Sequence, residues 1–416
     1  MVEEKRIALK NSGLIDPEDI NDYIRVGGYD ALKKALNGNP SSVIDELTKA
    51  GLRGRGGAGF PTGTKNLSTA ATCTDCNKYV VCNADEGEPG TFKDRIIMET
   101  DPHILVEGMI IAGYGIGANQ GYIYIRGEYY TSIERIKKAI EQAYSKNFLG
   151  EKILGSKFTF NLEIKLGAGS YLCGEELTLL ESLEGKRGYP RIKPPFPAQK
   201  GLWGKPTLIN NVETLANFPA IVLNGGKWYQ SMGTEKSPGT KIFTISGDVK
   251  NSGHRELILG AKLGDIINNV AGGTIDGKPW KAALLGGAAG TFVPYSFADV
   301  EMGYDKLKER GATLGSGAII VIGSEKHLIP ILQSILKFFK HESCGKCVPC
   351  RLGTSYLHEQ SLLLNKKNSE DRKEILNSML TQAQLIAKSS LCPLGQSPIL
   401  PIQSIINHFS DALINE

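Results

Sequence analysis

Three cysteines stand close together near the carboxyl end of the chain, where Cys344, Cys347 and Cys350 have the spacing C-x2-C-x2-C. The only cysteine after them is Cys392, in the segment SSLCPLGQ. A cubane iron–sulfur cluster uses closely spaced thiolates together with one distant cysteine, whereas zinc more often takes two C-x-x-C pairs. The spacing therefore predicts a [4Fe–4S] cluster bound by these four thiolates, and a structural zinc site is the alternative.

A glycine-rich segment, LRGRGGAGFPTGTK, contains the pattern Gly54-x-Gly56-x-x-Gly59. As a dinucleotide fingerprint, this pattern has meaning only between a strand and a helix. The preceding segment, NPSSVIDELTKAGL, predicts an amphipathic helix instead, which excludes the usual fingerprint. The glycines would still let backbone amides approach a phosphate or a ring. The neighbouring Arg55 and Lys65 favour such a ligand contact over a tight surface turn, which is the alternative.

Acidic residues follow two apolar segments further along the chain. KYVVC runs into NADEGEPG, which contains Asn83, Asp85 and Glu88, and NLEIKL runs into GAGSYLCGEE, which contains Glu175 and Glu176. Carboxylates that face one crevice repel each other, so their clustering favours a binding site over a structural role. Solvated helix caps would account for Glu175 and Glu176, but less readily for Asp85 and Glu88.

The segments around these residues alternate between strand and helix patterns. KYVVC, GYIYI and NLEIKL are typical of strands, and DPHILVEGMIIAGYGIG and TSIERIKKAIEQAY are typical of helices. We expect Asp101 to cap the first of these helices, with Pro102 in its first turn, and Ser41 or Ser42 to cap the helix before the glycine loop. This order predicts a doubly wound parallel sheet, whose ligands collect at the carboxyl ends of the strands. The periodicity on both sides of the cysteines predicts a small helix bundle whose loops carry the thiolates.

The composition excludes several classes of protein. A chain of 416 residues with 41% hydrophobic residues is long enough for two or three packed domains. The net charge of only +4, with basic residues scattered, indicates no nucleic-acid partner. The sequence shows no signal-peptide pattern and no apolar run long enough to span a bilayer. We therefore expect a cytoplasmic protein without direct membrane insertion, whose clustered cysteines are metal ligands or redox groups rather than structural disulfides.

Five segments in chain order resemble a known family: RGRGGAGFPTGTK, NADEGEPGTFKDR, GSYLCGEE, KPPFPAQKGLWGKPTLINNVET and ESCGKCVPCR. They resemble the NADH-binding flavoprotein subunit of respiratory complex I and the diaphorase subunits of NAD-linked hydrogenases and formate dehydrogenases. The similarity runs from about Leu52 to Cys392. It implies an NADH-dependent oxidoreductase that transfers hydride between NAD(H) and FMN and passes electrons singly to a [4Fe–4S] cluster.

The resemblance also implies a division of the chain into three parts. Residues 1–237 would form an N-terminal segment and a Rossmann-like domain for FMN and NADH, with a parallel sheet. Residues 238–325 would form a ubiquitin-like β-grasp domain, and residues 326–416 a helical bundle carrying the cluster. The fold class implied is therefore α/β.

The same resemblance assigns roles to residues that match the family's segments. The cofactor-binding set would be Gly54, Arg55, Gly56, Gly57, Phe60, Lys65, Asn83, Asp85, Glu88, Tyr171, Gly174, Glu175, Glu176, Lys193, Phe196, Asn210, Asn211 and Thr214. The glycine loop would contact FMN through its backbone and the Arg55 side chain, with Lys65 nearby. Glu88 and Glu176 would be the catalytic carboxylates. Glu88, together with Asp85, would position the nicotinamide end. Glu176 would bind the adenosine ribose and so favour NADH over NADPH.

The remaining roles concern the phosphate and adenine ends of the cofactors. Three residues of INNVET would hold the phosphate side of FMN: Asn210, Asn211 and Thr214. Phe60 and Phe196 would stack with NADH, and Lys193 would lie near its phosphates. Hydride transfer itself needs no general base, so the resemblance implies positioning rather than proton abstraction.

Two departures from the family stand out. Residues 66–68 are Asn-Leu-Ser where the family commonly has aromatic residues, so one adenine-stacking contact would be missing or supplied elsewhere. The segment TCTDC places Cys73 and Cys76 ahead of Cys82, an extra set that is either a zinc or redox site or a pair of incidental loop thiols. Cys173 is expected to be a small buried residue beside the flavin.

The partners follow from what the sequence lacks. The thioredoxin-like [2Fe–2S] domain fused to some hydrogenase relatives is absent, so we expect it as a separate subunit beside a larger iron–sulfur or catalytic subunit of a hydrogenase or formate dehydrogenase. The segments SLCPLGQ and LGSGAIIV are nearer to those relatives than to complex I, which is the alternative owner. An alternative from another class is a non-catalytic, metal-stabilised scaffold, against which the acidic strand ends and glycine loops argue.

Overall fold

A parallel sheet organises the first part of the chain in the computed structural model, which describes residues 2–73 and 76–415. Its strands are β1 (Tyr79–Ala84), β2 (Gln120–Arg126), β3 (Asn161–Gly167) and β4 (Thr207–Asn211). They lie in the order β3-β2-β1-β4, and each pair of neighbours is parallel. The predicted α/β class with a parallel sheet is confirmed, and the INNVET segment supplies the fourth strand.

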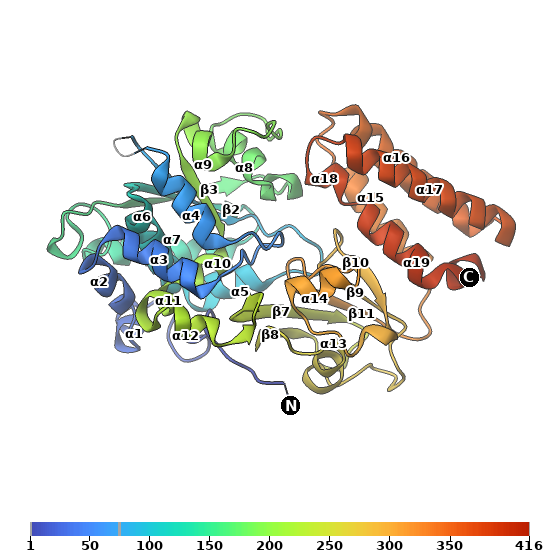
Figure 1. Cartoon of the computed structure of the whole chain (residues 1–416), viewed down its shortest axis with the longest axis horizontal. Coiled ribbons are helices and arrows are strands. Elements are labelled where there is room, and N and C mark those ends of the chain that lie inside the picture. Colours follow the sequence, from blue (N-terminus) through green and yellow to red (C-terminus); the bar gives the residue numbers. More distant parts are fainter. Residues whose placement is uncertain (1, 74–75, 416) are drawn as a thin grey trace.

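Helices cover both faces of this sheet (Figure 1). Successive strand residues point to opposite faces, so Val80 and Cys82 belong to a large core while Val81 belongs to a smaller one. The helices on the side of the large core are α5 (Lys93–Thr100), α6 (Pro102–Ile116), α7 (Tyr130–Ser145), α10 (Val212–Ala216) and α11 (Phe218–Asn224). The smaller core is covered by α8 (Glu176–Leu183) and the single turn η3 (Leu202–Gly204), with α9 (Pro197–Lys200) beside β4.

Further helices surround α6 and α11 at the amino-terminal end. They are α1 (Ile20–Arg25), α2 (Asp30–Leu36), α3 (Pro40–Ala50), α4 (Thr62–Ala71) and α12 (Gly226–Gln230). The expected cap of α6 is confirmed, because the Asp101 carboxylate accepts a hydrogen bond from the Ile104 amide at 3.2 Å. The expected cap of α3 is wrong. The helix begins at Pro40 with Asn39 in the cap position, since proline is well suited to the first helical residue.

A second, mixed sheet follows. Its strands are β7 (Thr240–Gly247), β8 (Gly253–Ile258), β9 (Ala282–Leu285), β10 (Thr291–Pro294) and β11 (Ala318–Ile322). The order is β10-β9-β11-β7-β8, and β11 runs parallel to β7 while the other pairs are antiparallel. The short helices α13 (Leu263–Asp265) and α14 (Tyr304–Glu309) pack with this sheet around a core of their own, and the short strands β5 (Gly233–Thr234) and β6 (Ser237–Pro238) precede it.

The last part of the chain is a group of helices. They are α15 (Ile329–Glu342), α16 (Val348–Leu363), α17 (Ser369–Ser389), α18 (Pro393–Gln396) and α19 (Ile399–Asn415). Their apolar faces form one core that also includes Phe292 of β10 and Leu172. The predicted C-terminal helices are therefore present. Within the described residues, none of the helices has the length and apolar character needed to cross a membrane.

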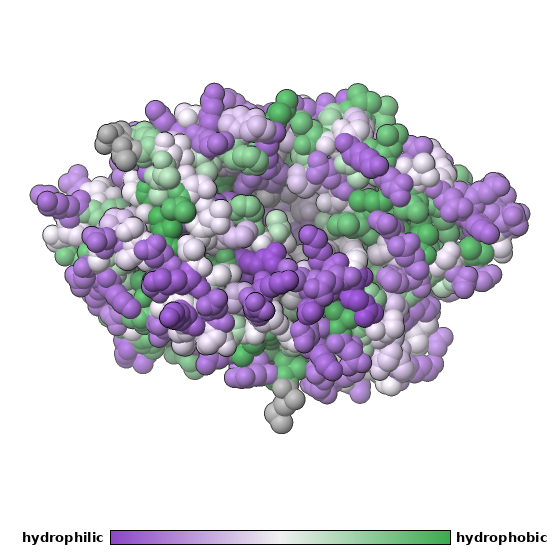
Figure 2. Space-filling model, in the orientation of Figure 1, coloured by the Kyte–Doolittle hydropathy of each residue, from purple (hydrophilic) through white to green (hydrophobic). Residues whose placement is uncertain are grey.

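The three regions meet beside the carboxyl ends of β1 and β3. The turn η2 (Tyr171–Gly174) follows β3, and its Tyr171 ring lies 4.9 Å from the Phe338 ring of α15. From the other side, the Glu88 carboxylate accepts a hydrogen bond at 2.9 Å from the amide of Ala289, which lies in the loop between β9 and β10. The surface is hollowed between these regions (Figure 2). The parallel sheet, the mixed sheet and the helices therefore all contribute to one place in the molecule.

Candidate functional site

The end of β1 is joined to the turn that follows β3. The Asn83 side-chain amide donates to the Gly174 carbonyl at 2.8 Å, and the Asp85 amide donates to the Asn83 side-chain oxygen at 3.2 Å. A Cβ atom at Gly174 would lie 3.4 Å from the Asp85 carbonyl oxygen. The backbones of these two segments therefore lie in close contact, as expected for a ligand crevice at the end of a parallel sheet.

Several buried polar atoms at these strand ends have no hydrogen-bond partner among the described residues. They are Oδ2 of Asp85, Nε of Arg126 and Nδ2 of Asn210. Buried polar groups are nearly always hydrogen-bonded, so these atoms fit a polar ligand held at the ends of β1, β2 and β4. A flavin with its ring nitrogens, carbonyls and phosphate matches this mixture of donors and acceptors.

Arg126 is a site residue that the sequence reasoning missed. It is the last residue of β2, and its guanidinium donates to the Glu86 carbonyl oxygen at 2.8 Å. Burial raises the pKa of Asp85 to about 7, and the positive charge of Arg126 opposes that rise. The available signal was its position, because a charged residue directly ended the predicted strand GYIYI.

The glycine loop lies against the end of β4. The Arg55 amide donates to the Thr214 hydroxyl at 2.9 Å, and a Cβ atom at Gly56 would lie 3.1 Å from the Asn211 Cβ atom. Gly57 has a φ of +141°, a conformation that favours glycine. The loop therefore brings its backbone close to the INNVET segment, as expected for a surface that cradles a cofactor.

The Arg55 side chain, expected to contact FMN, is directed toward other protein groups in the structure. The side chain is fully buried, and its guanidinium donates to the Tyr229 hydroxyl at 3.0 Å and to the Pro238 carbonyl at 2.8 Å. These partners tie the loop to the segment before the second sheet. A buried guanidinium keeps its charge only with such partners, so the side chain supports the loop while the backbone is left to face the crevice.

Asn210 and Asn211 have different hydrogen-bond partners. Asn211 caps α10 by accepting from the Glu213 amide at 3.0 Å, and its side-chain nitrogen donates to Asp94 at 2.6 Å. Asn210 keeps an unpartnered side-chain nitrogen among the described residues. Of the two, Asn210 has the free donor that a phosphate or ring oxygen requires.

The acidic pair after β3 is neutralised by lysines from two other segments. Glu176 lies 3.3 Å from the Lys65 ammonium and 3.0 Å from the Lys193 ammonium. Burial would raise the pKa of Glu176, but the two lysines outweigh it and hold the pKa below its usual range. Glu175 caps α8 by accepting from the Leu177 and Thr178 amides at 3.0 and 2.9 Å, and it also pairs with Lys193 at 2.8 Å. Glu175 thus has a structural role, and Glu176 is the carboxylate held near the crevice by ion pairs alone.

Glu88 is held from two sides. Its carboxylate accepts from the Tyr171 hydroxyl at 2.5 Å and from the Ala289 amide at 2.9 Å. Burial raises the pKa of Glu88, and these hydrogen bonds oppose the rise. Burial favours the neutral forms of Asp85 and Glu88, and the lysines balance the charge of Glu176. The repulsion expected among the acidic residues is therefore reduced by the protein and not by solvent.

The apolar side chains expected at the adenine end are exposed. Phe60 and Phe196 are 54% and 51% exposed, and Leu67 on α4 is 57% exposed. The end of α4 contacts α9, since the Thr72 hydroxyl donates to the Ala198 carbonyl at 3.0 Å. Exposed rings are available to stack on a planar ligand, and their contact with NADH stays a prediction.

The four cysteines of the predicted cluster are free thiols packed at one end of the helices. Cys347 and Cys392 occupy the cap positions of α16 and α18, and Cys350 lies in the first turn of α16. A Cβ atom at Gly395 would lie 2.9 Å from the Cys350 Cβ atom, which places the two helix starts in contact. Helix amino termini stabilise negative charge, whereas burial raises the pKa of Cys350, and that of Cys392 to about 11. A bound metal would therefore be needed to keep these two thiols ionised.

The arrangement also bears on which metal the thiolates would hold. Among the described residues, no three His, Cys, Asp or Glu side chains lie close enough to bind a single metal ion. Thiolates around one zinc ion stand roughly 3.8 Å apart, from a zinc–sulfur distance of about 2.3 Å. In a cubane each thiolate binds its own iron, so the sulfur atoms stand farther apart. The sequence spacing C-x2-C-x2-C with one remote cysteine, Cys392, favours the cubane over a zinc ion.

The extra cysteines form a disulfide between Cys73 and Cys76. Neither is therefore a free ligand for zinc, and Cys82 lies buried in β1 away from them as a free thiol. Cys173 is buried in the same small core as Leu177, as expected, and its position beside the flavin stays a prediction. The disulfide agrees with the redox alternative for Cys73 and Cys76 and not with a zinc site.

Comparison with known proteins places these features in a family. Residues 47–220 match the Nuo51 FMN-binding domain, and residues 330–416 match the NADH-ubiquinone oxidoreductase-F iron-sulfur binding region. The chain is 45% identical to the NADP-reducing hydrogenase protein HndC of Solidesulfovibrio fructosivorans over 98% of its length and 82% of that protein. It is 43% identical to the F 2 polypeptide of the NADH-quinone oxidoreductase of Rhizobium meliloti (strain 1021) over 97% of its length and 95% of that protein.

A solved structure agrees with the same assignment. The crystal structure of an NAD+-reducing [NiFe]-hydrogenase in the H2-reduced state matches with a TM-score of 0.86 and 33% identity, over 100% of this chain and 67% of that one. The resemblance stated from the sequence is thereby confirmed. FMN and a [4Fe–4S] cluster as cofactors are confirmed with it, because both matched regions are defined by those groups.

Proposed function

Because the chain belongs to the family of flavin and iron–sulfur subunits of NADH-quinone oxidoreductases and related hydrogenases, we propose that it works as the diaphorase subunit of an NAD-linked hydrogenase or formate dehydrogenase. The chain is an NADH dehydrogenase-type oxidoreductase subunit. The observation that carries the proposal is the turn η2, where Tyr171 contacts Glu88 at the strand ends and Phe338 in the helices. One turn thus joins the flavin end to the cluster end.

The residues at the strand ends would bind and orient the two cofactors. Bound FMN supplies the exchange between a hydride, which carries two electrons, and single-electron transfer to the cluster. The unpartnered atoms of Asp85, Arg126 and Asn210 would hold the flavin, and the glycine loop would let it approach the backbone. Glu88, fixed by Tyr171, would orient the nicotinamide end so that hydride transfer needs no further search.

Cofactor choice would depend on Glu176. A carboxylate that binds the ribose hydroxyls repels the extra phosphate of NADPH. In this chain Glu176 is paired with Lys65 and Lys193, so NADH would bind the carboxylate while the lysines stay near the pyrophosphate. The relative HndC is described as NADP-reducing, which makes the preference of this chain worth measuring.

The cluster would be bound by Cys344, Cys347, Cys350 and Cys392, and would hand electrons singly to a partner. We propose a thioredoxin-like [2Fe–2S] subunit and a larger iron–sulfur or catalytic subunit as those partners, and a cytoplasmic location. The domain division would be residues 1–237, 238–325 and 326–416, with the mixed sheet as a β-grasp-like unit. The first sheet, the second sheet and the final helices support those boundaries.

Complex I is the second candidate owner. The match to the NADH-quinone oxidoreductase polypeptide of Rhizobium meliloti covers 95% of that protein, against 82% for the hydrogenase protein HndC. The segments SLCPLGQ and LGSGAIIV favour the hydrogenase and formate dehydrogenase group. Purification of the native complex would identify the owner by its co-purifying subunits, since a hydrogenase or formate dehydrogenase subunit supports the proposal and quinone-reducing subunits contradict it.

The activity is tested on the isolated chain reconstituted anaerobically with FMN and iron. We expect NADH to reduce ferricyanide or a viologen, and Glu176→Ala to lower kcat/KM for NADH by about 10- to 100-fold, as expected for loss of a charged hydrogen bond. NADPH use should improve and FMN content should stay unchanged. An unchanged ratio of the two kcat/KM values would show that Glu176 does not discriminate between the cofactors.

A further inference from the structure

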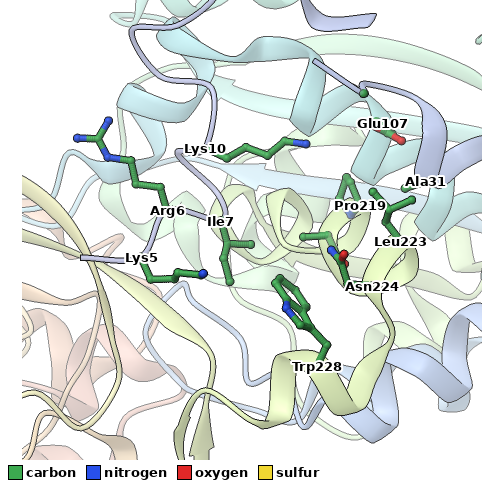
Figure 3. Close-up of a pocket in the computed structure, with 12 residues that line it drawn as sticks. Lys5, Arg6, Ile7, Lys10, Ala31, Glu107, Pro219, Leu223, Asn224 and Trp228 are labelled. Carbon is green, nitrogen blue, oxygen red and sulfur yellow. The ribbon is translucent and has the colours of Figure 1, made fainter. Parts of the chain in front are cut away.

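A small cavity lies outside the crevice at the strand ends, between the amino-terminal segment and the helices α2, α11 and α12 (Figure 3). Its volume is about 240 Å³. The residues that matter here are Lys5, Lys10, Ile7, Ala31, Leu223 and Trp228. None of them belongs to the set assigned to FMN, NADH or the cluster, so the cavity needs an explanation of its own.

The amino-terminal wall of the cavity is held in place by a buried carboxylate. Glu256 of β8 accepts hydrogen bonds from the backbone amides of Ile7, Ala8 and Leu9 at 2.9, 3.1 and 2.9 Å. The Thr240 hydroxyl donates to the same carboxylate at 2.6 Å. The segment that carries Lys5 and Lys10 is therefore anchored to the second sheet, and the cavity exists before any ligand arrives.

One side of the cavity is apolar and aromatic. Ile7 and Ala31 are buried, and the indole of Trp228 is half-buried at the edge of α12. Figure 3 shows Trp228 across the cavity from Lys10, and Leu223 beside Pro219 and Ala31. An indole face beside aliphatic side chains favours a flat, apolar group, because aromatic rings gain from stacking beyond the area that they bury.

The other side carries two ammonium groups. Lys5 and Lys10 extend from the anchored segment toward the helices, whereas Arg6 points away and pairs with Glu4 at 2.8 Å (Figure 3). The Lys5 backbone amide donates to the Glu256 carbonyl at 3.1 Å, but in residues 2–73 and 76–415 neither lysine side chain makes a hydrogen bond or an ion pair. The ammonium groups are therefore available to an anion.

One buried carboxyl, that of Glu107, lines the cavity, and a second, that of Asp101, lies close enough to be affected by the charge of Lys10. Lys10 opposes the rise that burial causes in the pKa of Asp101 and of Glu107. The Glu107 carboxylate already accepts three hydrogen bonds, from the Tyr23 hydroxyl at 2.6 Å and from the Tyr29 and Leu32 amides at 3.0 Å each. The charge of Glu107 attracts Lys10, but Lys10 makes no hydrogen bond to it. The Lys10 ammonium therefore keeps its donors for an external anion.

We propose that this cavity binds a small organic anion that consists of one flat apolar ring and one carboxylate or phosphate. The ring would lie against Trp228 and Leu223, and the anionic group would meet Lys5 and Lys10. The volume is below the roughly 300–1,000 Å³ of clefts that take drug-sized ligands. It therefore excludes a dinucleotide, and the site is distinct from the proposed NADH site.

The test uses the full chain with FMN and the cluster bound and three probes of nearly equal size. Benzoate and phenyl phosphate carry the two possible anionic groups, and benzamide is the neutral isostere of benzoate. Ligand-observed NMR titrations should show at least tenfold tighter binding of one or both anions than of benzamide. The tighter of the two anions identifies the anionic group, and equal binding of benzamide or no binding at all overturns the proposal.

Variants locate the binding. The double change Lys5→Gln and Lys10→Gln should weaken the preferred anion at least tenfold, and Trp228→Leu should weaken it severalfold. Lys227→Gln is the matched control, because Lys227 is exposed on α12 next to Trp228 and does not line the cavity. NADH oxidation should be unchanged in the lysine variants. An equal loss in the control, or displacement of the anion by NADH, would place the binding elsewhere and overturn the proposal.

Discussion

The flavin end and the cluster end of this chain are built by opposite means. At the strand ends, the groups that would bind a ligand are backbone segments and single unpartnered atoms, such as Oδ2 of Asp85 and Nδ2 of Asn210. Among the helices, they are four thiols at the starts of α16 and α18 and in the loop before α16. The first site recognises a shape and a set of hydrogen bonds, whereas the second forms bonds to a metal.

This difference has consequences for how each site responds to change. A site made of many weak contacts loses affinity in steps when one contact is removed. A cluster site depends on a complete ligand set, because each thiolate completes the coordination of one iron. Removal of one cluster ligand should therefore have a larger effect than removal of one contact at the strand ends.

The cluster should be lost when one ligand is removed. Cys392→Ser should lower the iron content from about four per chain to a small remainder, and onward transfer to partner clusters should stop. NADH should still reduce the bound flavin, because Cys392 lies in another region. Iron analysis and the reduced cluster's spectrum measure the effect. Cys173→Ser, which changes another buried free cysteine, should keep its iron, and an intact cluster in Cys392→Ser would mean that the fourth ligand is another group.

The flavin end should show a pH dependence that comes from burial. Burial raises the pKa of Asp85 from 3.8 to about 7. Between pH 5 and 7 the native carboxyl keeps a proton that the unfolded chain has lost, so its contribution to stability falls as the pH rises. From pH 5 to pH 8, the free energy of unfolding of flavin-free Asp85→Asn should therefore rise by about 2–3 kcal/mol relative to that of the native sequence.

Denaturant unfolding at the two pH values measures this gain. Asp299→Asn changes a side chain that is 91% exposed. Its free energy of unfolding should differ from that of the native sequence by the same amount at both pH values. An identical pH profile for Asp85→Asn and the native chain would mean that Asp85 is ionised at pH 5 in the folded protein.

Glu88 should contribute to NADH rather than to FMN. Glu88→Gln removes the negative charge that accepts from the Tyr171 hydroxyl and the Ala289 amide. The expected loss is about 10- to 100-fold in kcat/KM for NADH, the usual range for a charged hydrogen bond. FMN content should be unchanged, as should the activity of the control Glu325→Gln at a side chain that is 77% exposed. Loss of flavin instead would move Glu88 from the nicotinamide end to the FMN site.

The smallest effect should come from restoring an aromatic side chain. Leu67 is exposed on α4 where the family commonly has an aromatic residue. Leu67→Phe should lower KM for NADH about two- to tenfold, because a stacked ring contributes about 0.5–1.5 kcal/mol. Leu14→Phe, at another exposed leucine, should leave KM as it is. A KM that does not move in Leu67→Phe would show that adenine does not lie against α4.

The contrast between the two ends also explains what the sequence could predict. The thiolates were visible because C-x2-C-x2-C is a local spacing, and the parallel sheet was visible because apolar strands alternated with helices. The direction of the Arg55 side chain was not visible, because its partners Tyr229 and Pro238 lie far along the chain. Arg126 was missed for the same reason, because its place in the site depends on a hydrogen bond to the Glu86 carbonyl at the neighbouring strand end. The cap of α3 was misjudged because Pro40 fixes the first turn locally.

The position of Tyr171 has a consequence for the order in which the molecule is completed. Its amide donates to the Glu342 carboxylate at 3.0 Å across a separation of 171 residues. Glu88 depends on Ala289 across 201 residues. Such contacts close long loops and form late in folding. The region around Glu88, which we propose binds the nicotinamide end, therefore depends on contacts from the last third of the chain, so a chain that ended before Ala289 would lack a partner that fixes this carboxylate.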